Sequence, residues 1–189
     1  AVSCNTQKKE QGNPFFAEWK TPFGVPPFDQ IKNEHYLPAI DSGIALARLQ
    51  IAEITSNAET PTFANTVARY DRAGELMSKV AYVFYSQTSA NTNDTLEALQ
   101  MEIAPKVSAF SDEVLLNAEL FNRIKAVWEN RSAEQLNDEQ LFMLENMYKS
   151  FVRNGALLGP EDQEKLKKLN QELSVLTVKF SQNVLEETN

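Results

Sequence analysis

The sequence of 189 residues offers few side chains that could carry out catalysis. It contains one histidine, His35, and one cysteine, Cys4. A catalytic zinc ion commonly needs three protein ligands and a glutamate that activates water, and one histidine cannot supply that set. A nucleophilic serine or cysteine needs an adjacent base. Glu186 and Glu187 are neighbours on a predicted helix, so their carboxylates point apart. We predict no catalytic, cofactor-binding or metal-binding residue here, and a structural role for His35.

Composition and charge exclude several classes of partner. The 18 Lys and Arg residues are outnumbered by 26 Asp and Glu residues, which gives a net charge of −8. Binding to nucleic acid requires clustered basic residues, so we predict no nucleic-acid partner. No Gly-x-Gly sequence occurs, which removes the glycine-rich phosphate loops. The hydrophobic fraction of 42% is that of a globular protein with a packed core.

The first residues resemble the end of a bacterial lipoprotein signal. In Ala1-Val2-Ser3-Cys4, small residues precede a cysteine, and a polar stretch follows over residues 5–12. On this interpretation Cys4 carries lipid and tethers the protein to a membrane in the bacterial cell envelope or periplasm. Ala1 departs from the pattern, which prefers leucine there. The alternative is an unmodified thiol and a cytoplasmic location. We expect residues 1–12 to form a flexible tail and residues 13–189 one helical domain.

Prolines are concentrated before the body of the chain. Five of the eight lie at or before Pro38. Residues 14–32 carry four phenylalanines and one tryptophan among these prolines, which prevent a regular helix. We expect an extended strap laid across the helical body, with its aromatic rings packed against it. A proline-rich ligand for a partner domain is the alternative function of this segment.

The remaining sequence is poor in helix breakers and predicts an all-α fold. We expect an irregular antiparallel bundle of six or seven helices. The first is capped by Asn33, the second contains Gly74, and the third is kinked at Pro105. The spacing of apolar residues places the helices over about 33–56, 63–86, 93–110, 112–116, 118–130, 138–154 and from 160 onward.

The last predicted helix carries apolar residues that step by three or four positions, as in a coiled coil. We call them the leucine seam: Leu166, Leu169, Leu173, Leu176, Phe180 and Val184. We expect this seam to be packed, partly on further chain, because no helix stop signal follows Val184. Without such a cover we expect the chain to self-associate.

Seven segments, taken together and in order, resemble the N-terminal region of bacterial peptidyl-dipeptidases (dipeptidyl carboxypeptidases). The relatives of that family are oligopeptidase A, thimet oligopeptidase and neurolysin. The resemblance covers residues 13–189, nearly the whole chain. Its segments are Asn13-Pro14-Phe15-Phe16, residues 21–28, Glu34-His35-Tyr36-Leu37-Pro38-Ala39, residues 61–66, Ser89-Ala90-Asn91-Thr92, residues 102–106 and residues 151–157.

The resemblance implies a role in a larger enzyme. The family consists of helical zinc metallopeptidases with two lobes around a deep channel that admits short peptides. Their zinc site is a His-Glu-x-x-His helix with a later Glu, a motif that this sequence lacks. The resemblance therefore implies a non-catalytic wall of the substrate channel, inactive by itself, with a catalytic lobe and its zinc as the missing partner. The alternative is a stand-alone helical interaction module or lipoprotein without peptidase activity.

Overall fold

The computed structural model describes residues 12–188, and this part of the chain is all-α, as predicted. No strand occurs among these residues. The seven α-helices of the described part are α1 (Asn33–Thr55), α2 (Ala68–Arg72), α3 (Glu75–Ala90), α4 (Asp94–Leu115), α5 (Ala118–Asn130), α6 (Asp138–Arg153) and α7 (Pro160–Thr188). Four short 3-10 or π segments accompany them: η1 (Pro14–Phe16), η2 (Pro22–Gly24), η3 (Phe63–Val67) and η4 (Arg131–Ala133).

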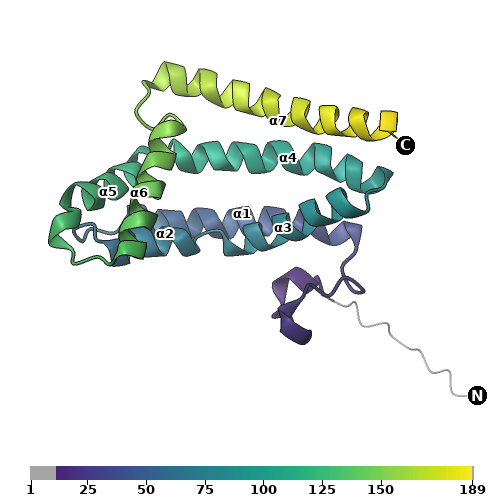
Figure 1. Ribbon diagram of the computed structural model, residues 1–189, viewed down its shortest axis with the longest axis horizontal. Helices are drawn as coiled ribbons and strands as arrows, with labels where there is room; N and C mark the ends of the chain where they lie inside the picture. Colours follow the sequence, from purple (N-terminus) through teal and green to yellow (C-terminus); the bar gives the residue numbers. More distant parts are fainter. Residues whose placement is uncertain (1–11, 189) are drawn as a thin grey trace, which may run out of the picture.

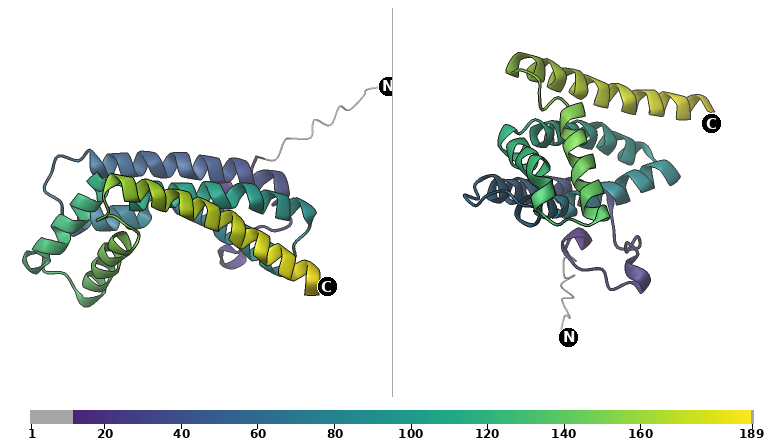
Figure 2. Two further views of the ribbon diagram at one scale, coloured as in Figure 1. Left: turned by 90° about the horizontal axis from the view of Figure 1, so that it is seen from above. Right: turned by 60° about the vertical axis from the view of Figure 1, so that its left-hand side comes forward.

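The helices form an irregular bundle. Helices α1, α3 and α4 run side by side, α5 and α6 gather at one end, and α7 lies along the side of α4 that faces away from α1 (Figures 1 and 2). The arrangement agrees with the predicted bundle of six or seven helices, with α2 as a single short turn.

Helix α1 lies at the centre of the bundle and begins with a reciprocal cap. The backbone N–H of Lys32 donates to Nδ1 of His35 at 3.0 Å, and the N–H of His35 donates to the carbonyl oxygen of Lys32 at 2.9 Å. The role of His35 is therefore structural, as predicted. Asn33 is the first helical residue and not the cap, because His35 satisfies the N–H group before it.

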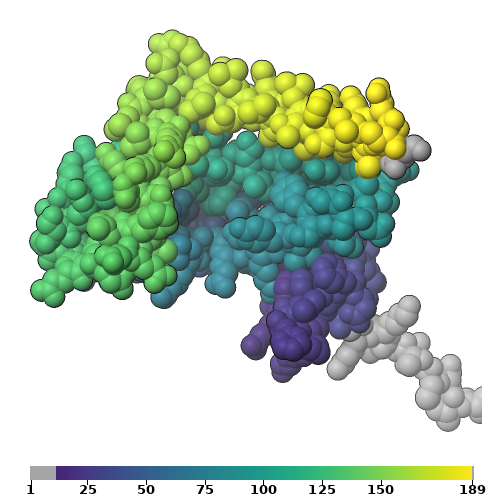
Figure 3. Space-filling model, in the orientation of Figure 1, coloured from purple at the N-terminus to yellow at the C-terminus, as the bar shows by residue number. Residues whose placement is uncertain are grey.

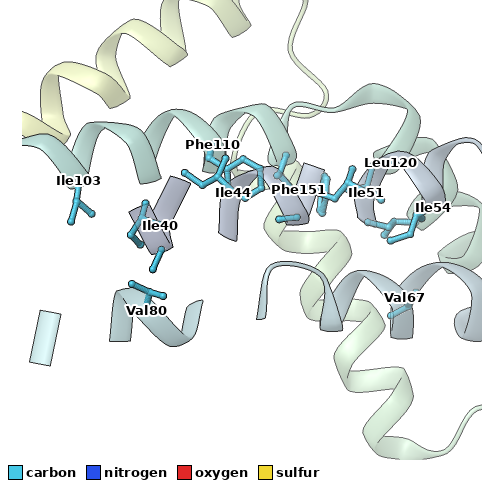
Figure 4. Close-up of a cluster of buried hydrophobic side chains, with 14 of the residues drawn as sticks. Ile40, Ile44, Ile51, Ile54, Val67, Val80, Ile103, Phe110, Leu120 and Phe151 are labelled. Atoms are coloured by element: carbon cyan, nitrogen blue, oxygen red, sulfur yellow. The ribbon is translucent and has the colours of Figure 1, made fainter. Parts of the chain in front are cut away.

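The apolar face of α1 is fully packed. Five apolar residues that recur at helical spacing are all buried: Ile40, Ile44, Ala47, Ile51 and Ile54. Ile40 points at Val80 of α3 in the core (Figure 4). Between two of these residues, Gly43 lets the backbones of α1 and α3 approach closely. A Cβ atom on Gly43 would lie 2.7 Å from the Cα atom of Met77.

The single helix predicted over residues 63–86 is wrong. The segment begins as the π-helical turn η3, continues as α2, and breaks at Gly74 before α3. Gly74 has φ = +80°, a conformation that other residues adopt only with strain. Its N–H donates to Oε1 of Gln50 in α1 at 3.0 Å. The glycine therefore ends one helix and caps the next.

The turn η3 is held in place by the buried Arg123 of α5. Its guanidinium donates to the carbonyl oxygen of Asn57 at 2.6 Å and to Oδ1 of Asn65 at 3.2 Å. A carboxylate oxygen of Glu134 accepts from the N–H of Phe63 at 2.7 Å. Two of these bonds satisfy backbone groups that have no helical partner: the carbonyl of Asn57 before the turn and the N–H of Phe63 at its start.

Helix α4 is longer than predicted. The expected end at Phe110 and the separate helix over 112–116 are both wrong, because α4 runs continuously to Leu115. Pro105 removes one hydrogen bond from the helix. The helix continues because it packs on α1 and α7, and Ile103 and Phe110 on its inner face are buried.

Helices α5 and α6 agree closely with prediction. Asn117 and Asn137 cap them, each accepting a backbone hydrogen bond at 2.9 Å. Phe151 of α6 is buried and stacks on Phe121 of α5 with ring centres 6.0 Å apart. Leu141 is 38% exposed because it lies in the first turn of α6, away from this contact.

The N-terminal strap packs on the bundle only in part. Phe15 is buried against Tyr36 at 5.5 Å between ring centres, and the ammonium group of Lys79 lies 3.9 Å from the centre of the Trp19 ring. Phe16, Phe23 and Phe28 are exposed, contrary to the expectation that all the aromatic rings of the strap would be packed. The strap meets the bundle through η1 and through Trp19, and the exposed phenylalanines after them extend past the core.

The leucine seam is mostly unpacked within residues 12–188, and its predicted cover by further chain stays a prediction. Four of its six residues are at least 61% exposed, and Val178, on the opposite face of α7, is the one that packs. The stripe has the spacing of a packed seam, but α7 binds α4 through its other face.

Two substitutions by alanine test this distribution of the core. Phe151→Ala should lower the free energy of unfolding by about 3 to 5 kcal/mol because it empties a fully buried site. Leu173→Ala should change it by less than about 0.5 kcal/mol, because Leu173 is 61% exposed. Urea unfolding followed by circular dichroism measures both. A large loss with Leu173→Ala would mean that the seam is packed after all.

Gly43→Ala tests the close contact of α1 and α3. The added methyl group meets the backbone of Met77, which cannot rotate away, so we expect a loss of about 1 to 3 kcal/mol. The exposed neighbour Ser42→Ala is the matched control and should be neutral or slightly stabilising, since alanine favours the helix. Thermal unfolding of both variants makes the comparison, and equal melting temperatures would contradict the close approach.

Candidate interaction surfaces

The residues whose types could support chemistry do not come together in one site. Among residues 12–188, no group of three or more His, Cys, Asp and Glu side chains could hold a metal ion. His35 caps α1, and Glu186 and Glu187 are exposed near the end of α7. Cys4 lies outside the described residues, so its lipidation stays a prediction.

Over the described range of 12–188, none of the helices combines the length and the apolar character needed to cross a bilayer.

The outer face of α7 carries a row of exposed apolar side chains. We call Leu169, Leu173, Leu176 and Phe180 the outer stripe; their side chains are 62%, 61%, 61% and 71% exposed. Helix α7 forms one edge of the molecule, and no other described element lies over it (Figures 1 and 3). Large apolar side chains gathered in one exposed stripe mark an interaction site.

The inner face of α7 explains why the stripe points outward. Nδ2 of Asn170 donates to Oδ1 of Asp112 at 2.7 Å, and Nε2 of Gln182 donates to the carbonyl oxygen of Glu97 at 3.2 Å. Val178 is buried between these two polar contacts. The polar bonds to α4 fix the rotation of α7 about its own axis, and the leucines are left on the opposite face.

A second surface is a groove of about 400 Å³ beside α1. Its lining comes from α1, the α2–α3 segment, α4 and α6. Most of these side chains are apolar, and Asp71, Ser78 and Ser111 add polar groups. Met77 and Met147 contribute flexible side chains that adapt to different apolar shapes. The groove can therefore hold an apolar side chain beside hydroxyl and carboxylate groups.

Tyr70 lines one end of this groove. Burial raises the pKa of its phenol to about 12, because the charged form loses contact with water. Its ring packs on Phe151 with centres 5.6 Å apart. At neutral pH Tyr70 therefore contributes a neutral aromatic wall that is supported by the core.

Sequence reasoning identified parts of these surfaces but did not assemble them. The residues of the outer stripe were predicted as members of a packed seam. The groove was missed, because Met77, Phe110 and Met147 come from three helices and no sequence spacing relates them. The available signal was Met147, because its position four residues before Phe151 places both on one face of a helix.

The chain is similar in sequence to known peptidases. No protein-family model matches the chain. It is 39% identical over 173 residues to the dipeptidyl carboxypeptidase of Escherichia coli, covering 92% of this chain and 25% of that protein. Identity to the dipeptidyl carboxypeptidase of Salmonella typhimurium is 38% over the same shares. Oligopeptidase A of Salmonella typhimurium is 24% identical, with 89% of this chain and 25% of that protein covered.

These similarities confirm the resemblance predicted from the motifs. The chain is a member of the dipeptidyl carboxypeptidase and oligopeptidase A family in sequence, and it spans about a quarter of the length of the curated relatives it matches.

The raised pKa of Tyr70, a partly buried residue, predicts a loss of stability in alkaline solution. The pKa of Tyr70 is about 12 in the folded protein and about 10 in the unfolded chain. Its contribution is fully present below pH 10 and is lost as the pH rises from about 10 to about 12, because the unfolded chain ionises first. Burial raises the pKa values of Tyr36 and Tyr85 also, which adds to the loss.

Tyr70→Phe should make the alkaline loss smaller by up to about 2 kcal/mol. Denaturant unfolding from about pH 8 to about pH 12 measures it for both proteins. The difference between the two proteins should be constant below about pH 9 and should change only above it. Parallel profiles up to the highest pH would show that the Tyr70 phenol is not buried as described.

Proposed function

We propose that this chain is the N-terminal, non-catalytic helical domain of a zinc metallopeptidase that removes dipeptides from the carboxyl end of short peptides. The observation that carries the proposal is the 39% identity to a dipeptidyl carboxypeptidase over 92% of this chain, which accounts for only 25% of that relative. A share of that size is a domain, and the remaining three quarters offers room for a catalytic lobe.

The chemistry is proposed to lie in that remainder. With one histidine, this sequence cannot supply the ligands of a catalytic zinc ion, so the ion, its ligands and the water-activating glutamate belong to the missing lobe. This chain contributes a rigid wall of the substrate channel. A peptidase that admits short peptides into a channel needs a rigid wall, since a wall that yields would not reject larger substrates.

Two properties of the bundle support a wall. Its centre is closely packed, with the buried stripe of α1 against α3 and α4. The groove beside α1 is open and mostly apolar, and it offers a hollow in which a peptide side chain could lie. Asp71 and the net charge of −8 would also make the field near the wall negative. Such a wall would restrict access without contacting the reacting atoms.

A stand-alone interaction module, or a lipoprotein tethered through Cys4, is the second candidate function. The exposed outer stripe favours it, because such a stripe fits a partner protein. Location in the bacterial envelope depends on lipid at Cys4, and a mass measurement of the protein isolated from membranes tests it. An unmodified thiol would favour the cytoplasmic alternative.

Peptide cleavage separates the two candidates. A longer protein that carries this chain at its N-terminus should release C-terminal dipeptides from a fluorescence-quenched peptide, with activity that a chelator removes and zinc restores. The chain of 189 residues by itself should show none. Deleting residues 1–189 from the longer protein should relax the size limit on substrates or prevent folding.

Two results would contradict this proposal. The first is chelator-sensitive cleavage by the 189-residue chain together with one bound zinc ion per molecule. The second is a deleted protein that folds, keeps full activity and still rejects longer peptides, which would show that this domain is not the barrier.

A further inference from the structure

We infer that the outer stripe of α7 is self-complementary and binds α7 of a second copy of this chain in antiparallel orientation. The inference concerns the 189-residue chain and does not rest on the proposed peptidase role. It begins from the four large apolar residues that lie exposed on one face of a helix otherwise anchored to α4.

The spacing of the stripe fits an antiparallel pair. In heptad terms Leu173 and Phe180 occupy a positions, and Leu169 and Leu176 occupy d positions. Antiparallel helices place a residues opposite d residues. Leu173 then meets Leu176 of the second copy, and Leu169 meets Phe180. The twofold axis of the dimer repeats each of these residue pairs once. The same stripe on both copies therefore forms the whole interface.

The charges beside the stripe select the antiparallel orientation. Lys165, Glu172, Lys179 and Glu186 recur every seven residues along one flank, with alternating sign. An antiparallel pair sets this flank against itself, with Glu172 opposite Lys179 of the second copy and Lys165 opposite Glu186. A parallel pair would instead set it against Asn170, Thr177 and Val184, which carry no charge. Complementary charges form only in the antiparallel case.

The central pair of charges is available for this contact. Glu172 and Lys179 are both exposed, and neither makes an ion pair within residues 12–188. Lys165 already contacts Glu161 at 2.8 Å and Asp162 at 3.2 Å, so its contribution to a dimer is smaller. The main selection therefore comes from Glu172 and Lys179 at the centre of the stripe.

Helix α7 is already folded and fixed on α4 before association. Asn170, Val178 and Gln182 hold α7 on α4, so association does not have to fold it. Helix α7 runs along one edge of the molecule in Figure 3, and the four side chains of the stripe are exposed. It covers only about two heptads, which is small for a protein interface. We therefore expect a dimer that forms reversibly and depends on concentration.

Analytical ultracentrifugation of the 189-residue chain from about 10 µM to about 1 mM tests the dimer. The average mass should rise from 21.3 kDa toward twice that value. Leu173→Glu should keep the chain monomeric over the whole range. Leu49→Glu is the matched control, because Leu49 is 64% exposed on α1, and it should dimerise like the wild type. Circular dichroism should show that both variants keep their helix content.

Charge exchange tests the orientation. Glu172→Lys and Lys179→Glu each place like charges together twice in the dimer, and each should weaken it about three- to tenfold. The double variant restores opposite charges and should recover the wild-type dissociation constant. The single variants change the net charge of −8 in opposite directions, so weakening by both excludes a general charge effect.

Three results would overturn the inference. A chain that stays monomeric at the highest concentration would leave the stripe to another occupant, such as the rest of a longer polypeptide. Equal loss of association in Leu49→Glu and Leu173→Glu would move the contact away from α7. A double charge variant no better than the single ones would reject the antiparallel pairing.

Discussion

The close packing of α1 against its neighbours is the contact on which the rest of the structure depends. One face of α1 meets α3, α4 and α5, and its first turn meets the N-terminal strap. Gly43 allows the backbone of α1 to approach Met77, and the αL conformation of Gly74 redirects the chain so that α3 can lie there. The groove beside α1 and the position of α4 both follow from this arrangement. Helix α7 in turn depends on α4.

Helical periodicity predicted most of this architecture, because the buried face of α1 and the asparagine caps of α5 and α6 are local signals. It failed where two local rules compete. Gly74 reads as a tolerated residue inside a helix, but a bond to Gln50 in another helix stabilises a break there. Pro105 reads as the sign of an early helix end near Phe110, but packing on both sides of α4 keeps the helix continuous to Leu115.

The outer stripe shows that the spacing of apolar residues does not predict which element covers a helix face. An apolar stripe at a spacing of three and four residues predicts that one face of a helix avoids water, and it does not say which neighbour provides the cover. In α7 the face that packs within the chain contains Asn170, Val178 and Gln182, and only one of these is apolar. Hydrogen bonds to α4 depend on the tertiary arrangement and leave no trace in the periodicity. The groove was missed for the same reason.

Because α7 is held on α4 by one face and exposes the outer stripe on the other, binding at the stripe also affects the stability of the helix. Its hold on α4 consists of a few polar bonds and one fully buried valine, which is far less apolar contact than α1 makes. Segments held by few buried apolar contacts open more readily than a packed core. Any occupant of the outer stripe binds only when α7 is helical, so it stabilises that state by mass action. Because the groove is lined by α1, the α2–α3 segment, α4 and α6, and not by α7, binding at the stripe can stabilise α7 and leave the groove open.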